Sequence, residues 1–216
     1  DTDLSISMEE ASIQELNASF TSDTNQIHLN AQADFLTADI YIGESITEIG
    51  SLIHSYRSYL STFVDSSHSS ANNRIAELPT TNITGSITYH DAIGMLLQDT
   101  GIHIGNLDFS LSNSASDQSL NYAVTGSDLK YKSIEIGELN ASAVDSAGIM
   151  DIQVLANKNI VFENPAYDIV LESHYDNWQS SAELTVIDDS GKFIYNLALA
   201  SDLDSNMFVI NLPEQK

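Results

Sequence analysis

The side chains of this sequence that could do acid–base or metal chemistry are its six histidines and 31 acidic residues. The histidines lie at positions 28, 54, 68, 90, 103 and 174, and no two of them have the spacing of a motif such as H-E-x-x-H. The closely spaced carboxylates at 1–3 and 202–204 are not followed by the glycine and distal glutamate of a calcium loop. The sequence therefore predicts no metal site.

Residues for nucleophilic catalysis are also missing from the sequence. The chain has no cysteine, and its serines do not form the G-x-S-x-G turn of a hydrolase. A carboxylate pair for glycoside hydrolysis stays open as an alternative because the separation of such a pair is spatial. Most acidic residues fall on presumed outward strand faces and in turns. We therefore expect no catalytic residues, no cofactor and no enzyme activity.

The charge balance bears on partners. With 31 acidic and 7 basic residues, the formal net charge is −24, which disfavours nucleic acid because phosphate binding needs clustered Lys and Arg.

The absence of cysteine fits the cytoplasm or a bacterial periplasm. No apolar run approaches the roughly 18 residues that a spanning helix requires, so we expect a segment that does not itself cross a membrane. We expect 1–216 to form one β-rich domain that was cut from a longer chain.

Alternation with a period of two residues dominates the sequence and predicts β-strands with one buried face. Leu16, Ala18 and Phe20 alternate with polar residues, and the stretch from Ile27 to Phe35 does the same. Ile102 and Ile104 begin another alternating stretch, whose phase shifts at Asn106 before Leu107. Looser candidates follow at 129–136, 139–144, 150–156, 167–174, 182–187, 193–200 and 207–212.

A faint internal repeat supports a repeating strand, turn and strand. The sequence IHIGNL at 102–107 matches IEIGEL at 134–139, and ELNAS occurs at both 15–19 and 138–142. A short polar turn and another alternating strand follow each copy. Chance similarity within a β-meander of this composition remains the alternative.

Two segments have helical spacing instead. Apolar residues from Ile46 to Val64 form a wide amphipathic stripe, and Ser45 with Glu48 predicts a capping box at its start. The polar stretch that follows predicts a mobile loop over 65–80. A shorter helix is predicted from Ala92 to about Gln98, with Asp91 as its N-cap.

These elements predict a mainly β fold with some helix (α+β), in which a curved antiparallel sheet wraps around one long amphipathic helix. The reason is that a sheet with one apolar face loses about 25 cal/mol for every Å² left in water, so a cover is expected. A short second helix completes the predicted fold. The candidate contacts of the apolar face, either core or lipid, are Ile49, Ile53, Tyr56, Leu60, Leu107, Phe109, Leu111, Leu120 and Tyr122.

The sequence over about 10–160 resembles TamB-like proteins of the AsmA-like group from Bacteroidetes-type bacteria, and KYKSIEIGELNAS at 130–142 is its most family-like piece. The resemblance implies a non-catalytic β-groove in the periplasm, part of a cell-envelope protein anchored in the inner membrane. The implied function is lipid transport or protein assembly in outer-membrane biogenesis, with phospholipid acyl chains and outer-membrane assembly proteins as partners. A helix packed on the apolar face would occlude such a groove, which is where this sequence departs from the family.

A ligand-binding or adhesion module of a bacterial cell-surface protein is the alternative. In that case the core is closed and the partner meets the acidic surface. An open cavity along the apolar face would favour the groove, and a fully closed core would favour the module.

Overall fold

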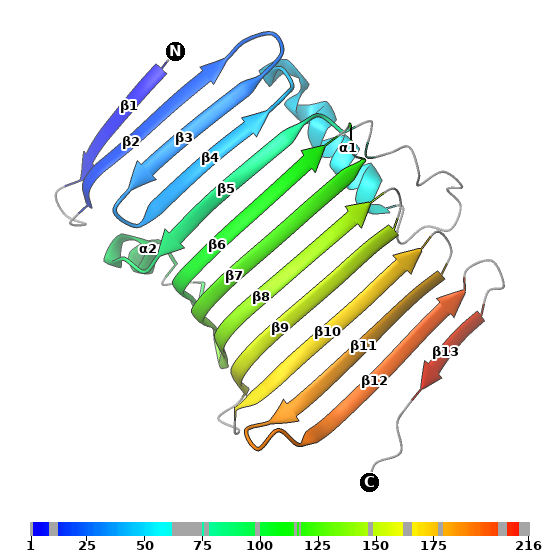
Figure 1. Cartoon of the computed structure of the whole chain (residues 1–216). Helices are drawn as coiled ribbons and strands as arrows, with labels where there is room; N and C mark the ends of the chain where they lie inside the picture. The colour runs from blue at the N-terminus through cyan, green and yellow to red at the C-terminus, as the bar shows by residue number, and fades with distance from the viewer. Residues whose placement is uncertain are drawn as a thin grey trace.

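A computed structural model of the chain describes residues 2–8, 13–61, 75, 78–97, 100–114, 116, 118–146, 149–161, 166–176, 179–202 and 207–211. Its strands form a single 13-stranded antiparallel sheet in which the strand order follows the sequence order (Figure 1). The strands are β1 (Thr2–Met8), β2 (Ile13–Ser22), β3 (Ile27–Ala33), β4 (Leu36–Ile42), β5 (Thr81–Thr88), β6 (Ile102–Ser114), β7 (Ser119–Tyr131), β8 (Ile134–Ser146), β9 (Ile149–Val161), β10 (Tyr167–Asp176), β11 (Gln179–Asp188), β12 (Phe193–Asp202) and β13 (Met207–Asn211).

Two helices interrupt the meander. A 3-10 turn (Ile46–Glu48) leads into α1 (Ile49–Ser61), and α2 (Asp91–Leu97) lies between β5 and β6. Neither described helix is long and apolar enough to cross a membrane. The capping box does not form, because the Ser45 hydroxyl pairs with the Thr47 hydroxyl and the Ser51 hydroxyl donates to the Glu48 carboxylate.

The predicted α+β fold, with its sheet wrapped around one long helix, is wrong. The structure is nearly all antiparallel sheet, and α1 has 13 residues. A helix of that length extends only about 20 Å, whereas thirteen strands about 4.8 Å apart extend roughly 58 Å. The sheet is therefore the framework of the molecule, and α1 covers a small part of it. The candidate strand at 129–136 is also wrong, since a turn at Lys132 and Ser133 separates β7 from β8.

The predicted loop falls mostly outside the described residues. Residues 62–74, 76 and 77 are among those not described. Ile75 and Leu78, near the end of that loop, are each only 3% exposed and pack together in the small core.

The repeat found in the sequence marks a line that crosses four neighbouring strands. The paired residues on either side place Gly105 of β6 opposite Asp128 of β7, Asp128 opposite Gly137 of β8, and Gly137 opposite Lys158 of β9. Asp128 and Lys158 have left-handed backbones, with φ of 51° and 54°. A Cβ on Gly105 would lie 2.6 Å from the Cβ of Asp128, and one on Gly137 would lie 2.8 Å from the Cβ of Lys158. Only glycine fits at these two positions, which accounts for the glycine of each I-x-I-G copy. We call these four residues the glycine line.

The alternation of side chains changes phase at the glycine line. On one side of it the apolar residues of β7 are Leu120, Tyr122 and Val124, and on the other they are Leu129 and Tyr131. The Cδ1 atom of Leu129 lies 3.0 Å from the Cβ position of Gly126, so Leu129 is on the same face as the earlier apolar residues. A left-handed residue inverts the pleat in the manner of a β-bulge. Since the strands shift phase together, their register is unbroken and the apolar side chains stay on one face.

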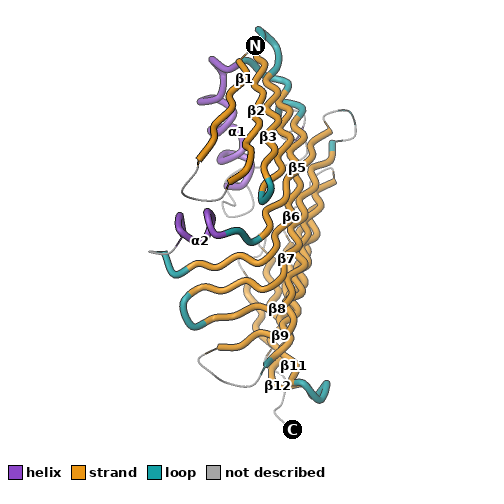
Figure 2. The backbone as a smooth tube through the Cα atoms, turned by 90° about the vertical axis from the view of Figure 1, so that its left-hand side faces the viewer, coloured by secondary structure: helices purple, strands orange, loops and turns teal. Residues whose placement is uncertain are grey.

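The sheet curves toward the side that carries the helices. In Figure 2 the ends of β6–β9 nearest α2 sweep toward this side, and both helices lie there. The side with the helices is therefore concave.

Candidate functional site

The strand register separates apolar from polar side chains across the sheet. One row of directly paired residues runs from β2 to β12 and contains only Ala, Gly, Phe, Val and Leu: Ala18, Ala31, Ala38, Gly85, Phe109, Val124, Ala141, Val154, Leu171, Leu184 and Leu197. The adjacent row, one residue along each strand, points to the other face and is polar apart from two alanines: Ser19, Asn30, Asp39, Thr84, Ser110, Ala123, Ser142, Gln153, Glu172, Glu183 and Ala198. We call the faces that carry these rows the apolar face and the polar face.

The apolar face is half-buried along the whole row. All eleven of its residues have intermediate exposure, which neighbouring side chains in the same sheet produce without a second layer. All described strands belong to one sheet, so the described chain supplies no β-layer to cover this face. Among the described residues, the fully buried hydrophobic ones are few: Ile27, Ile75, Leu78, Ala92, Leu120, Met150 and Ala156. The apolar face is thus a concave surface that the described residues cover only locally.

Helix α1 covers the apolar face at one end of the strands. Tyr56 of α1 packs against the buried cluster of Ile75, Leu78, Leu120 and Met150. Its hydroxyl donates a 3.0 Å hydrogen bond to Oγ1 of Thr81, at the start of β5. This bond and this packing hold α1 against the sheet. The described part of α1 therefore covers the apolar face only at this end of the strands.

Polar groups are buried beneath this cover. Asp145 of β8 is 1% exposed and is paired across the sheet with Leu120 and Met150. The pKa of Tyr122 is raised to about 12, chiefly by burial and in smaller part by the nearby Tyr56 and Asp145. Burial also raises the pKa of Tyr56, against the effect of its hydrogen bond to Thr81. The two phenols therefore stay protonated under the α1 end of the sheet at neutral pH.

The candidate residues from the sequence divide between this cover and the open part of the face. Leu120 is fully buried, and Tyr122 and Tyr56 pack beside it. The β6 candidates, Leu107, Phe109 and Leu111, lie half-buried on the apolar face.

The remaining candidates are on α1. Ile53 is 65% exposed and so takes no part in the packing on the sheet. Ile49 and Leu60 lie in α1, and their side chains are outside the described set. The cover also includes Met150, Ile75 and Tyr175, which the sequence did not single out. The sequence did hold a signal for Met150, which lies at the start of the alternating stretch that predicts β9. It held none for Ile75, a single apolar residue in the predicted loop.

The polar face carries two exposed histidine–carboxylate pairs. Nε2 of His28 lies 2.7 Å from Oδ1 of Asp39, and Nδ1 of His174 lies 2.6 Å from Oδ1 of Asp151. All four side chains are about half exposed or more. Within the described ranges, no three His, Cys, Asp or Glu residues come together as a metal-binding group.

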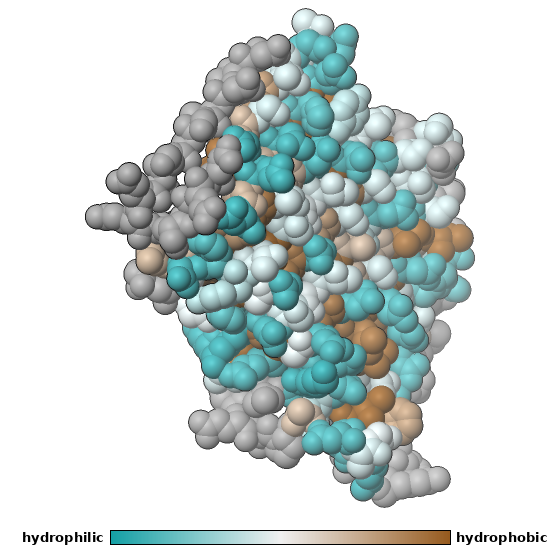
Figure 3. All heavy atoms as spheres, turned by 60° about the vertical axis from the view of Figure 1, so that its left-hand side comes forward, coloured by the Kyte–Doolittle hydropathy of each residue, from teal (hydrophilic) through white to brown (hydrophobic). Residues whose placement is uncertain are grey.

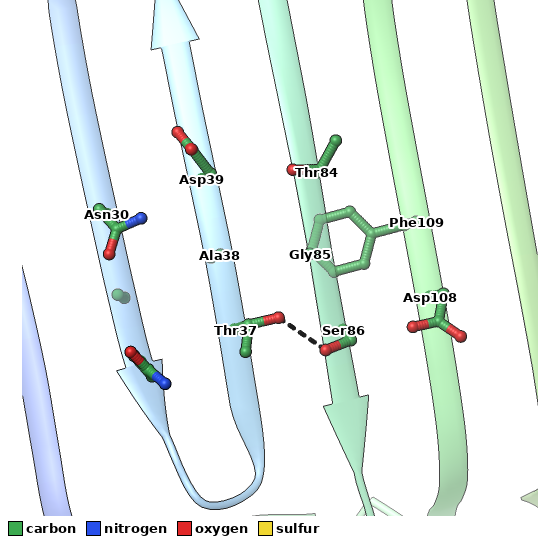
Figure 4. A pocket seen from close by; sticks show the side chains of 11 residues that line it. Asn30, Thr37, Ala38, Asp39, Thr84, Gly85, Ser86, Asp108 and Phe109 are labelled. Carbon is green, nitrogen blue, oxygen red and sulfur yellow. Dashed lines mark hydrogen bonds between the residues drawn. The ribbon is translucent and has the colours of Figure 1, made fainter.

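A shallow depression crosses β3–β6 on the polar face (Figure 4). Its walls include Asn30, Asp39, Thr84 and Asp108, and the hydroxyls of Thr37 and Ser86 bond across it at 2.6 Å. A second depression lies over β8–β12 around the pair of His174 and Asp151. These are furrows between rows of short polar side chains.

No protein-family model, curated protein or solved structure was found to match this chain.

Proposed function

We propose that the chain is a non-catalytic, TamB-like β-groove segment that holds phospholipid acyl chains along its apolar face, in the periplasm of a bacterial envelope. The observation that supports this best is the uninterrupted apolar row from Ala18 to Leu197, which is half-buried in each of the eleven strands β2–β12 and is backed by a polar row. A closed core would bury such a row.

The dimensions of the apolar face suit acyl chains. Ten steps of about 4.8 Å between eleven strands give a row roughly 48 Å long. One leaflet of a bilayer core is about 15 Å thick, so several acyl chains fit along the face. Covering the face removes its half-exposed side chains from water at about 25 cal/mol per Å². The hydrophobic effect is not directional, so such a surface does not distinguish one acyl chain from another.

The role in the cell follows the resemblance. In that reading the segment belongs to a longer protein anchored in the inner membrane, and it carries phospholipid toward the outer membrane or assists outer-membrane assembly proteins. The surface charge of −24 keeps the polar face in water while the other face holds the lipid.

A binding module that meets its partner on the polar face is the second candidate. The depression of Figure 4 favours it, because it presents amide, hydroxyl and carboxylate groups in rows. The two candidates use opposite faces of the same strands, so neighbouring residues can distinguish them.

The test compares two pairs of substitutions on β9 and β10. Val154→Ser with Leu171→Ser alters the apolar face, and Gln153→Ser with Glu172→Ser alters the polar face one residue along. Delipidated protein is incubated with labelled phospholipid and separated by gel filtration. We expect the apolar pair to weaken retention about tenfold or more, because two aliphatic contacts are lost, and the polar pair to leave it unchanged.

Circular dichroism provides the check that both double variants keep the sheet. Equal retention by the wild type and by both variants, or no retention by any of them, would contradict the proposal.

A further inference from the structure

Exposed hydrophobic residues gather where the strands end near α2. Ile102, Tyr131 and Ile134 are paired in one line across β6, β7 and β8, and they are 40%, 50% and 38% exposed. Tyr89, before α2, and Met95, on α2, are also 50% and 55% exposed. The Tyr89 ring stacks 5.1 Å from the ring of His103 on β6. We call the three paired residues, Ile102, Tyr131 and Ile134, the lip; Tyr89 lies outside it, because His103 alternates with Ile102 and faces the other side of β6.

The lip continues the apolar face. Leu129 is on that face, and Tyr131 lies two residues farther along the same strand. Pairing places Ile102 and Ile134 beside Tyr131, so all three project from the concave side. The phase change at the glycine line is what brings them there, since without it they would point to the polar side.

A second exposed hydrophobic site lies at the same ends of the strands. Phe193 and Ile194, at the start of β12, are 67% and 47% exposed. In Figure 3, where the left-hand side of Figure 1 comes forward, hydrophobic residues surface as separate patches among hydrophilic ones. This mixture of aromatic, aliphatic and polar side chains is typical of a surface that meets lipid headgroups.

The lysines are concentrated at these ends as well. Four of the five lysines of the chain lie here, namely Lys130, Lys132, Lys158 and Lys192. Nζ of Lys132 lies 5.0 Å above the ring of Tyr131, with its methylene chain available to extend along apolar surface. A lysine beside an exposed tyrosine suits the level at which phosphate groups lie above acyl chains.

The charge of this edge points to a neutral membrane. Lys130 bonds Glu135 at 2.6 Å and Lys158 bonds Glu138 at 2.9 Å, so two of the lysines are already neutralised. The chain as a whole carries −24 and is repelled by an anionic surface. The partner that fits is therefore a zwitterionic bilayer, held by apolar insertion and not by net charge.

We infer that the lip rests on the surface of a neutral phospholipid bilayer, and that the apolar face opens directly onto this bilayer. This inference rests on the proposed function and adds the place where lipid enters. An acyl chain that leaves the bilayer at the lip meets apolar side chains at once, because Ile102, Tyr131 and Ile134 connect the bilayer to the half-buried row.

The test is flotation of the full chain with phosphatidylcholine vesicles. Tyr131→Ser with Ile134→Ser alters the lip. Val144→Ser with Ile149→Ser is the matched control, since these residues are 43% and 40% exposed at the opposite ends of β8 and β9. We expect the lip pair to lower the vesicle-bound fraction about tenfold, and the control pair to change it little.

Two further results are expected, namely weaker flotation with phosphatidylglycerol vesicles and little effect of salt on flotation with neutral ones. Wild-type protein that stays with the aqueous fraction, equal losses in both variants, or binding to anionic vesicles alone would overturn the inference. So would self-association through the lip, detected as a dimer by sedimentation that the lip pair abolishes.

Retention of labelled phospholipid in the absence of vesicles separates this inference from the proposed function. Protein that retains lipid but does not float contradicts the lip alone. Two results contradict the groove, whatever the flotation result. One is that the protein retains no lipid, and the other is that its lipid retention does not depend on Val154 and Leu171.

Discussion

Glycine at positions 105 and 137 is a steric requirement of the glycine line. Each faces a left-handed residue across the strand, and the position of a Cβ is already occupied in both cases. A side chain there would push the two backbones apart and disturb the common change of phase. Gly50 in α1 carries no such constraint, because nothing lies within 4 Å of its Cβ position.

Gly105→Ala is therefore expected to destabilise the fold by about 1–3 kcal/mol, the usual cost of forcing atoms into a packed site. Gly50→Ala is the control, and it should stabilise α1 by up to about 1 kcal/mol because alanine is the better helix former. Urea unfolding measures both. Equal stability of the two variants would show that the glycine line is not sterically tight.

Tyr122 links stability to alkaline pH. Its pKa is raised from 10.0 to about 12, chiefly by burial, so the folded state disfavours the phenolate. Stability is then fully present below pH 10 and is lost as the pH rises toward about 12. Tyr122→Phe should remove part of that loss, and unfolding free energies measured across this range test it. Tyr56, whose pKa is also raised, should account for a further part. An identical pH dependence in wild type and Tyr122→Phe would contradict the burial of this phenol.

At the scale of whole elements, the described contacts that attach helix α1 to the sheet are few. Tyr56 supplies the packing and the hydrogen bond to Thr81, whereas Ile53 on the same helix faces solvent. A short amphipathic helix has little stability of its own in water, so its order depends on such tertiary contacts.

Tyr56→Phe should cost about 0.5–1.5 kcal/mol through the lost hydrogen bond, and should raise hydrogen exchange in α1 more than in β7 or β8. Tyr131→Phe serves as the control, because that tyrosine is half exposed at the end of β7 that lies away from α1. Uniform exchange changes across the whole sheet would mean that α1 is part of the global folding unit.

The strands were the elements most accessible to prediction from sequence. Alternation locates β2, β3 and β6 because one face of each strand is apolar and a slip of one residue would reverse it. The phase shift at Asn106 was visible too, but its cause was not, since it depends on the left-handed residue Asp128 of the next strand. The amphipathic stripe located helix α1. The prediction that the sheet wraps around this helix was wrong, because the size of the sheet depends on all the strands together.

The molecule as a whole is a single curved sheet whose two faces have opposite chemistry. That division could be predicted, because a period of two residues dictates it strand by strand. Where the cover lies could not be, since Ile75, Leu78 and Tyr175 meet only through tertiary structure. The apolar surface that this leaves partly exposed is the basis of the proposed function.

Direct contact between acyl chains and one face of the sheet is the central claim, and the absence of cysteine makes it measurable. A fluorophore is attached to a single cysteine at Val154→Cys or at its neighbour Gln153→Cys, and phospholipid with a nitroxide on its acyl chain is added. Strong quenching at position 154 and little at 153 is the expected result. Equal quenching at both positions, or quenching at 153 alone, would contradict the account.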